Sequence, residues 1–306
     1  MRDLVDDADQ LLDWEAVTGR LAAATPAHAP DKRSGYHGLT YGYLIGEVAR
    51  RATGKSMSQL VQELLSDPLQ LDGLHIGLPD THHGRCADLI SRFEQQKPVS
   101  RKSAIPVSPR ALLARPEVVD LLNLGLRFYD IDLHNLTRAL SARGITRMNM
   151  NSAAVREAIM PSMNGMFTAR SLAKVYAALA NGGHWDNIRL LSSGTVARAT
   201  QVQIKQRDRV VPIRMHWRLG YHGVFNRQGK LKQAFGHFGF GGSGAWGDPS
   251  RGLGVAMTLN SGVGTPFGDW RIVKLSDIIT DCADRRMGRP VTEKRGFSPL
   301  SLVLDR

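Results

Sequence analysis

The chain has 306 residues, of which 42% are apolar and 31 are glycine, so it reads as a globular protein with a sizeable core and many turns. Its formal net charge is +12, but the basic residues lie in small scattered groups without interleaved aromatic residues, which favours a solvated surface over nucleic-acid binding. No stretch approaches the ~20 apolar residues that a membrane-spanning helix needs, so no transmembrane segment is expected.

Residues 1–25 open with an acidic stretch that lacks the basic region and apolar run of a signal peptide, so a cytoplasmic location is expected. Apolar residues then recur at helical spacing up to Pro26, and a loop is predicted from there to Gly38. A second helix should follow and end at Gly54. The apolar face that this helix is expected to bury consists of Tyr41, Leu44, Ile45, Val48 and Ala52.

Ser56 to Gln59 forms a predicted capping box for a third helix, which Pro68 should end. Residues 79–118 are rich in proline, serine and charge, which predicts a long irregular excursion that could serve as a lid. This excursion contains His82-His83, but adjacent histidines point in different directions, so a solvated loop is favoured over a metal site. No metal and no cofactor are expected. The two cysteines, Cys86 and Cys282, predict free thiols rather than a disulfide framework.

The second half of the chain places helices before strands. Helices are predicted over 119–145 and from Thr168 to Ala180, short strands around 210–224, a hairpin turning at Asp248–Gly252, and a last helix over about 269–286. Because strict β-α alternation is missing, the fold class should be α+β, with an antiparallel sheet flanked by helices. One domain is expected over 1–287, helical and loop-rich over about 27–195 and sheet-forming over about 196–287, followed by a tail over 288–306.

Four stretches in a fixed order carry a family pattern across most of the chain. They are the loop around Tyr36 with "YGYLIGEVARRATGKS", then "DPLQLDGLHIGLP", "ARSLAKVYAALANGG" and "FGHFGFGGSGAWGDPSRGLGVAMTLN". This order resembles the serine hydrolases of the class C β-lactamase and penicillin-binding-protein superfamily, especially the esterase and β-lactamase-related branch. The resemblance implies a β-lactamase/transpeptidase-like α+β fold. It also implies hydrolysis of small-molecule carboxylic esters or related acyl compounds by serine acylation.

The resemblance also assigns roles to particular residues. Tyr36 would be the family tyrosine that shares the general-base work, and His237 would stand in the strand motif beside the cleft. A tyrosine has a pKa of ~10, so it becomes a useful base only when a neighbouring cation favours its phenolate. Gly38 replaces the asparagine of Tyr-x-Asn, and the backbone N–H of Phe240, just after Gly239, would supply an oxyanion donor. Gly38 and His237 favour esters over β-lactams or D-amino peptides.

The nucleophile motif of the family, Ser-x-x-Lys, is missing from its expected place before Tyr36. Ser171 and Lys174 match the motif in letters, but they follow Tyr36 and lie on a helix whose apolar face should belong to the core, so a chance match is predicted. The chain therefore resembles a member of the family that is incomplete at its N-terminus. Such a chain should leave apolar faces uncovered and a sheet edge unpaired, and should be weakly stable as a lone monomer.

Three functions compete at this point, and the oligomeric state stays open. The first is a hydrolase of carboxylic esters, supported by the order of the motifs. The alternative is a non-catalytic or degraded remnant that keeps the binding cleft, supported by the missing nucleophile. A basic nucleic-acid or membrane-surface protein has only the net charge in its favour.

Overall fold

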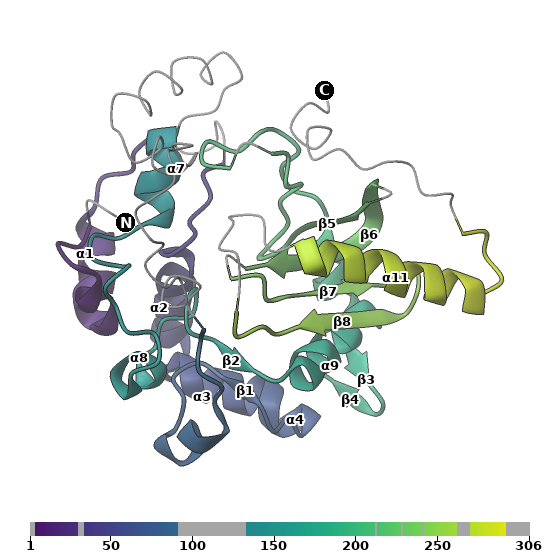
Figure 1. The fold of residues 1–306 in the computed structure, drawn as a ribbon, viewed down its shortest axis with the longest axis horizontal. Helices are drawn as coiled ribbons and strands as arrows, with labels where there is room; N and C mark the ends of the chain where they lie inside the picture. Colours follow the sequence, from purple (N-terminus) through teal and green to yellow (C-terminus); the bar gives the residue numbers. More distant parts are fainter. Residues whose placement is uncertain are drawn as a thin grey trace, which may run out of the picture.

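A computed structural model of the chain describes residues 4–29, 34–90, 133–211, 213–227, 229–239, 241–261 and 270–291 (Figure 1). The helices of the described part are η1 (Ala8–Leu12), α1 (Trp14–Ala23), α2 (Tyr41–Thr53), α3 (Met57–Val61), η2 (Gln62–Ser66), α4 (Asp67–Leu69), η3 (Asp80–Arg85), α7 (Leu133–Leu140), α8 (Ala153–Glu157), α9 (Ala169–Ala180), α10 (Ser193–Thr200) and α11 (Trp270–Arg286). The strands are β1 (Leu74–His75), β2 (Met166–Phe167), β3 (His184–Trp185), β4 (Ile188–Arg189), β5 (His222–Asn226), β6 (Gly229–Phe238), β7 (Gly244–Asp248) and β8 (Leu253–Met257).

The main sheet is antiparallel, with strand order β5-β6-β7-β8, and helices cover both of its faces. Because side chains alternate along a strand, the neighbouring residues Trp246 and Gly247 face opposite sides. Trp246 is fully buried beside Ile272 of α11, which Figure 1 shows lying across the sheet. On the other side, Gly247 of β7 pairs with Gly254 of β8. A Cβ on Gly254 would lie 2.3 Å from the backbone nitrogen of Ala177 in α9. These two glycines therefore let α9 rest directly on the sheet, and the expected α+β architecture is confirmed.

Helices α1 and α2 pack together through one large buried side chain and a close backbone approach. Tyr43 is fully buried, donates its hydroxyl to the carbonyl of Leu11 at 2.6 Å, and lies with its ring 5.2 Å from that of Trp14. A Cβ on Gly46 would lie 2.6 Å from the Trp14 ring. The indole of Trp14 also donates to Glu47 at 2.9 Å, so the buried side of α2 mixes aromatic, small and charged residues.

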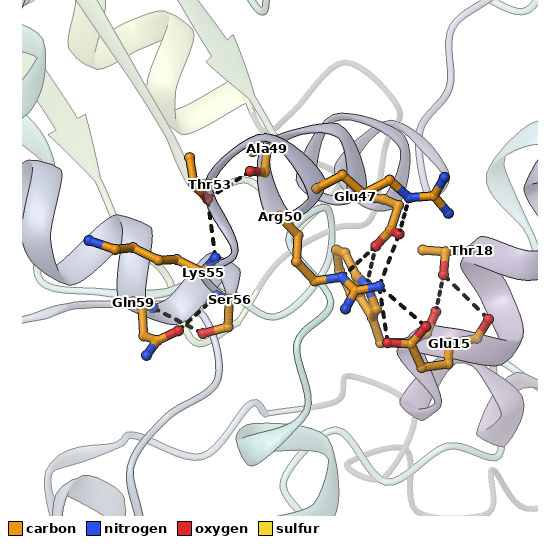
Figure 2. Close-up of polar contacts among 11 residues, drawn as sticks. Glu15, Thr18, Glu47, Ala49, Arg50, Thr53, Lys55, Ser56 and Gln59 are labelled. Atoms are coloured by element: carbon orange, nitrogen blue, oxygen red, sulfur yellow. Dashed lines mark hydrogen bonds and ion pairs between the residues drawn. The ribbon is translucent and has the colours of Figure 1, made fainter.

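The apolar face of α2 that was expected to be buried points outwards, so this prediction is wrong. Its side chains are 38% to 66% exposed in Tyr41, Leu44, Ile45 and Val48, and Ala52 is exposed too. The core contact goes to the opposite side because Gly42 and Gly46 allow close approach there. Glu47 meanwhile gains ion pairs with Arg50 and Arg51, each at 2.7 Å (Figure 2). The four side chains of Tyr41, Leu44, Ile45 and Val48 are called the outer face of α2 below.

The capping box before α3 is confirmed, whereas the predicted stop at Pro68 is wrong. The side chain of Gln59 accepts from the backbone N–H of Ser56 at 2.8 Å, and the Ser56 hydroxyl accepts from the N–H of Gln59 at 3.3 Å (Figure 2). The helix continues through the π-helical turn η2 into α4. Pro68 lies in the first turn of α4, where its missing N–H is not needed.

The later elements agree with most of the sequence predictions. Helix α9 begins after its cap Thr168, the hairpin turn at 248–252 joins β7 to β8, and α11 matches the last predicted helix. Of the helix predicted over 119–145, the structure describes α7, which ends at Leu140, and residues 119–132 lie outside the described part. Residues 91–118 of the expected lid and residues 292–306 of the expected tail also lie outside it.

One strand prediction needs correction, and two other findings complete the description. Strand β5 starts only at His222, whereas residues 210–211 and 213–221 are irregular apart from a bridge between Trp217 and Ile204. At the start of this segment, Oδ1 of Asp208 accepts the backbone N–H groups of Val210 and Val211, which are therefore not available to a neighbouring strand. Both cysteines are free thiols. Within the described ranges, no helix combines the length and the apolar character needed to cross a bilayer.

Candidate active site

The structure brings Tyr36 and His237 together from opposite ends of the sequence. Tyr36 lies in the loop before α2, and His237 lies near the end of β6, where it pairs with Ala245. The Tyr36 hydroxyl oxygen is 3.2 Å from Nε2 of His237, and the two rings are stacked at 6.0 Å. The loop tyrosine and the strand histidine therefore form one hydrogen-bonded pair across 201 residues of sequence.

Both members of this pair are neutral at physiological pH. Burial and, to a smaller extent, the negative charge of Asp208 together raise the pKa of Tyr36 to about 12. Burial lowers the pKa of His237 to about 4. A neutral imidazole carries one ring proton, so the tautomer of His237 decides whether the phenol donates to Nε2 or the Nε2–H donates to the phenol oxygen. A cation near the hydroxyl would have to be added before Tyr36 could act as a base.

A second histidine, His222, supports His237 from β5. It is 1% exposed, and its ring lies 4.9 Å from that of His237. Its Nε2 accepts from the backbone N–H of Phe238 at 3.0 Å, so its proton sits on Nδ1, which donates to the carbonyl of Gly223 at 2.8 Å. Burial, and then the neighbouring His237, lower the pKa of His222 to about 3. Sequence reasoning missed this residue because a single histidine in a strand carries no local signature.

Two further residues, Trp217 and Asp208, contact Tyr36, and the sequence analysis did not identify them. The indole of Trp217 stacks on the Tyr36 ring, with centroids 5.1 Å apart and planes 12° apart. Its N–H donates to Oδ2 of Asp208 at 3.0 Å, while Oδ1 of Asp208 accepts the backbone N–H of Tyr36 at 2.9 Å. Asp208 lies 172 residues from Tyr36, and an aspartate in an irregular segment has no periodic pattern that would mark it.

The predicted substrate-binding glycines have specific local surroundings. A Cβ on Gly38 would lie 2.4 Å from Cδ2 of Leu140 and 3.2 Å from the ring of Tyr36, so Leu140 occupies the space beside this position. Gly239 donates its N–H to the carbonyl of Ser243 at 2.7 Å, within the turn that joins β6 to β7. The predicted oxyanion donor, Phe240, lies outside the described residues.

Ser171 and Lys174 have the contacts of ordinary helix residues. Ser171 is 2% exposed, accepts from the hydroxyl of Thr168 at 2.9 Å, and donates to Asp72 at 3.4 Å. The ammonium group of Lys174 donates to the carbonyl of Leu69 at 2.7 Å and lies over the ring of Trp185. The serine belongs to the N-terminal cap of α9, and the lysine to its flank.

The neighbouring histidines His82 and His83 turn to different partners. The ring of His82 lies 4.9 Å from that of His75, whereas Nε2 of His83 lies 3.3 Å from Glu157. In the part of the chain that the structure covers, no three His, Cys, Asp or Glu side chains are placed to hold a metal ion together.

The fold defines a class of protein. An antiparallel sheet with helices on both faces is the β-lactamase/transpeptidase-like arrangement that the sequence resembled. The chain belongs to the Beta-lactamase family, whose model matches residues 2–276.

Its relatives include named esterases and penicillin-binding-protein homologues. The esterase/β-lactamase LipL of Mycobacterium tuberculosis is 35% identical over 253 residues, which are 82% of this chain and 53% of LipL. A family VIII carboxylesterase is 30% identical, with a TM-score of 0.71, and the match covers 90% of this chain and 66% of that one. A penicillin-binding-protein homologue from Caulobacter crescentus is 32% identical, with a TM-score of 0.63, and the match covers 87% of this chain and 64% of that one. The chain thus spans about half the length of LipL and about two thirds of the two solved structures.

Proposed function

We propose that this chain supplies the tyrosine and the strand histidine of a serine hydrolase that acts on carboxylic esters. The observation that carries the proposal is the hydrogen bond between Tyr36 and His237, which joins the two motif residues at one point of the fold. The relatives LipL, an esterase/β-lactamase, and the family VIII carboxylesterase support an ester as the substrate class. The glycine at position 38 and the histidine at position 237 favour the same class.

The reaction proceeds by acyl transfer. A serine hydroxyl attacks the ester carbonyl and gives its proton to the phenolate of Tyr36, so that a tetrahedral oxyanion forms. The oxyanion collapses, the C–O bond to the alcohol breaks, and Tyr36 returns the proton to the leaving alkoxide. Water then attacks the acyl-enzyme by the same route and releases the acid. His237, neutral at pH 7, holds the tyrosine oxygen beside the reacting carbonyl.

Such a mechanism requires a positive charge next to Tyr36, because a phenol with a pKa of about 12 gives up too little of its proton at neutral pH. Neutral His237 does not supply this charge. We assign the charge to the lysine of a Ser-x-x-Lys motif outside these 306 residues. The contacts of Ser171 and Lys174 within α9 leave that pair unsuited to the role.

The outer face of α2 supports a place for the missing segment. This face begins five residues after Tyr36 and exposes four large side chains at helical spacing. Leu219, which is 54% exposed, precedes Gly220, where a Cβ would lie 3.4 Å from the hydroxyl of Tyr41. An apolar helix seated on this surface would lie next to the part of the chain that follows the tyrosine loop.

The proposal is tested with the 306-residue chain and with a chain extended by the upstream coding sequence, provided that this sequence supplies a Ser-x-x-Lys motif in frame. The extended chain should hydrolyse a chromogenic short-chain ester and react with a fluorophosphonate at the new serine, whereas the short chain should do neither. Tyr36→Phe should lower kcat/KM of the extended chain by about 10²–10⁴-fold, because it removes the base. Ser171→Ala is the matched control and should leave turnover intact.

A fluorophosphonate label on Ser171 in the short chain would overturn the placement of the nucleophile. A second candidate function, a non-catalytic remnant that binds acyl compounds, is motivated by the missing motif. An upstream stop codon or frameshift, together with ligand binding without turnover, would favour this remnant over the hydrolase.

A further inference from the structure

Asp208 is a buried carboxylate whose hydrogen bonds all serve the region around Tyr36. The residue is 2% exposed. Its Oδ1 accepts the backbone N–H groups of Tyr36, Val210 and Val211 at 2.9, 2.8 and 3.1 Å, and its Oδ2 accepts the indole N–H of Trp217 at 3.0 Å. A buried charge is tolerated only with such complete hydrogen bonding.

These bonds act on two different parts of the tyrosine. The bond from Oδ1 fixes the main chain of Tyr36 in its loop. The bond from Oδ2 fixes Trp217, whose ring lies nearly parallel to the phenol ring at 5.1 Å. The phenol therefore has a defined plane on one side and a hydrogen-bond partner, His237, at its tip. One carboxylate restrains both the position and the orientation of this side chain.

We propose that Asp208 is the positioning residue of this site, which holds the Tyr36 hydroxyl against His237 by binding the tyrosine main chain directly and its ring through Trp217. The inference deepens the proposed function, since it explains how a loop residue keeps a catalytic geometry without being part of a helix or strand. Asp208 itself touches neither the hydroxyl of Tyr36 nor, in this mechanism, the substrate.

The charge of Asp208 has a second effect on the same phenol. The groups that face Tyr36 are Asp208 and Trp217 from the segment before β5 and His237 from β6, with His222 of β5 behind His237. Both histidines are neutral. Burial is the main cause of the raised pKa of Tyr36, and the charge of the Asp208 carboxylate adds to the rise. Replacing the carboxylate by a neutral group should lower that pKa.

The test uses the full chain with 3-fluorotyrosine incorporated at position 36 and followed by fluorine NMR, so that no turnover is needed. Fluorination lowers the intrinsic pKa of the phenol, so that its titration is reached at a lower pH. The parent protein should give one narrow signal. Asp208→Asn should give broadened or multiple signals and a lower pKa. Trp217→Phe should also broaden the signal, but it should leave the pKa nearly unchanged because the carboxylate remains.

A matched control separates positioning from general stability. Asp248 is 1% exposed and accepts hydrogen bonds from Ser250 and Arg251 at the turn between β7 and β8. Asp248→Asn should lower the unfolding temperature without altering the fluorine signal or its pKa. A single unshifted signal with the parent pKa in Asp208→Asn would overturn the proposal, and so would an equal disturbance in Asp248→Asn. If Asp208→Asn fails to fold, a narrow unchanged signal in Trp217→Phe would overturn it instead.

This experiment also remains decisive if the proposed function fails. A chain that never hydrolyses an ester still reports whether Asp208 orders Tyr36. Conversely, if the extended chain is active but the fluorine signal of Tyr36 is unchanged in Asp208→Asn, the proposed function stands and the positioning role of Asp208 is wrong.

Discussion

The two neutral histidines of the site make the fold sensitive to acid. His222 is almost completely buried and its pKa is lowered to about 3, whereas a histidine in the unfolded chain has a pKa of about 6.5. The unfolded state therefore binds the proton first as the pH falls. The stability that the neutral imidazole contributes is complete above pH ~6.5 and is lost progressively between ~6.5 and ~3.

His222→Gln should remove this contribution while leaving the local hydrogen bonds possible, because an amide can both accept from Phe238 and donate to Gly223. Between pH 7.5 and pH 5 the parent protein should lose roughly 1–2 kcal/mol of unfolding free energy more than the variant does. Urea unfolding at the two pH values measures the difference. An equal loss in both proteins would show that His222 is protonated in the folded state.

At the scale of secondary-structure elements, the two sides of α2 lie in opposite environments. Tyr43 faces the core, is fully buried, and bonds to Leu11, whereas Ile45 on the outer face is 48% exposed. Tyr43→Ala should lower the unfolding free energy by about 3–5 kcal/mol, since it opens a cavity and removes a buried hydrogen bond. Ile45→Lys should change the unfolding free energy by less than about 0.5 kcal/mol.

Denaturant unfolding of the two variants checks this contrast, and an extended chain with a Ser-x-x-Lys helix adds a control. If such a helix covers the outer face, Ile45→Lys should become strongly destabilising in the extended chain, because it would place a charge in a buried contact. Equal, small effects of Ile45→Lys in both chains would contradict the assignment of the missing helix to this surface.

The outer face also shows what sequence patterns can and cannot predict. Periodicity correctly placed Tyr41, Leu44, Ile45 and Val48 on one face, but it cannot tell which side of the helix meets the core. The opposite side is buried because Gly46 lets Trp14 approach, and a glycine carries no hydrophobic signal. Elements with their own local signals, such as the capping box and the β7–β8 hairpin, were predicted well.

The residues around Tyr36 show the same limit. That Tyr36 and His237 lie close together could be predicted, because each belongs to a motif whose order along the chain is informative. Asp208, Trp217 and His222 could not, because their roles arise from contacts between distant or irregular segments. A carboxylate that binds three main-chain N–H groups is visible only after the chain has folded around it.

At the scale of the whole molecule, the described sheet ends at β5 on one side and at β8 on the other, and α2 leaves an apolar face in solvent. The match with LipL covers 82% of this chain and 53% of LipL. The 306-residue chain should therefore be weakly stable when isolated, with an unfolding temperature below the ~45–65 °C of ordinary domains. Scanning calorimetry on the dilute protein measures this temperature.

Binding of a hydrophobic dye can show which exposed surface accounts for the expected low stability. Binding of such a dye to the folded chain should fall in an Ile45→Lys, Val48→Lys double variant, because the outer face of α2 is the surface that the dye would contact. The dye signal should stay constant in a control variant, Leu191→Lys, whose side chain is 40% exposed beside β4, away from this helix. A cooperative transition at high temperature with little dye binding would mean that the 306 residues form a self-sufficient fold. The outer face would then be an ordinary solvated surface, and the nucleophile would need another place to dock.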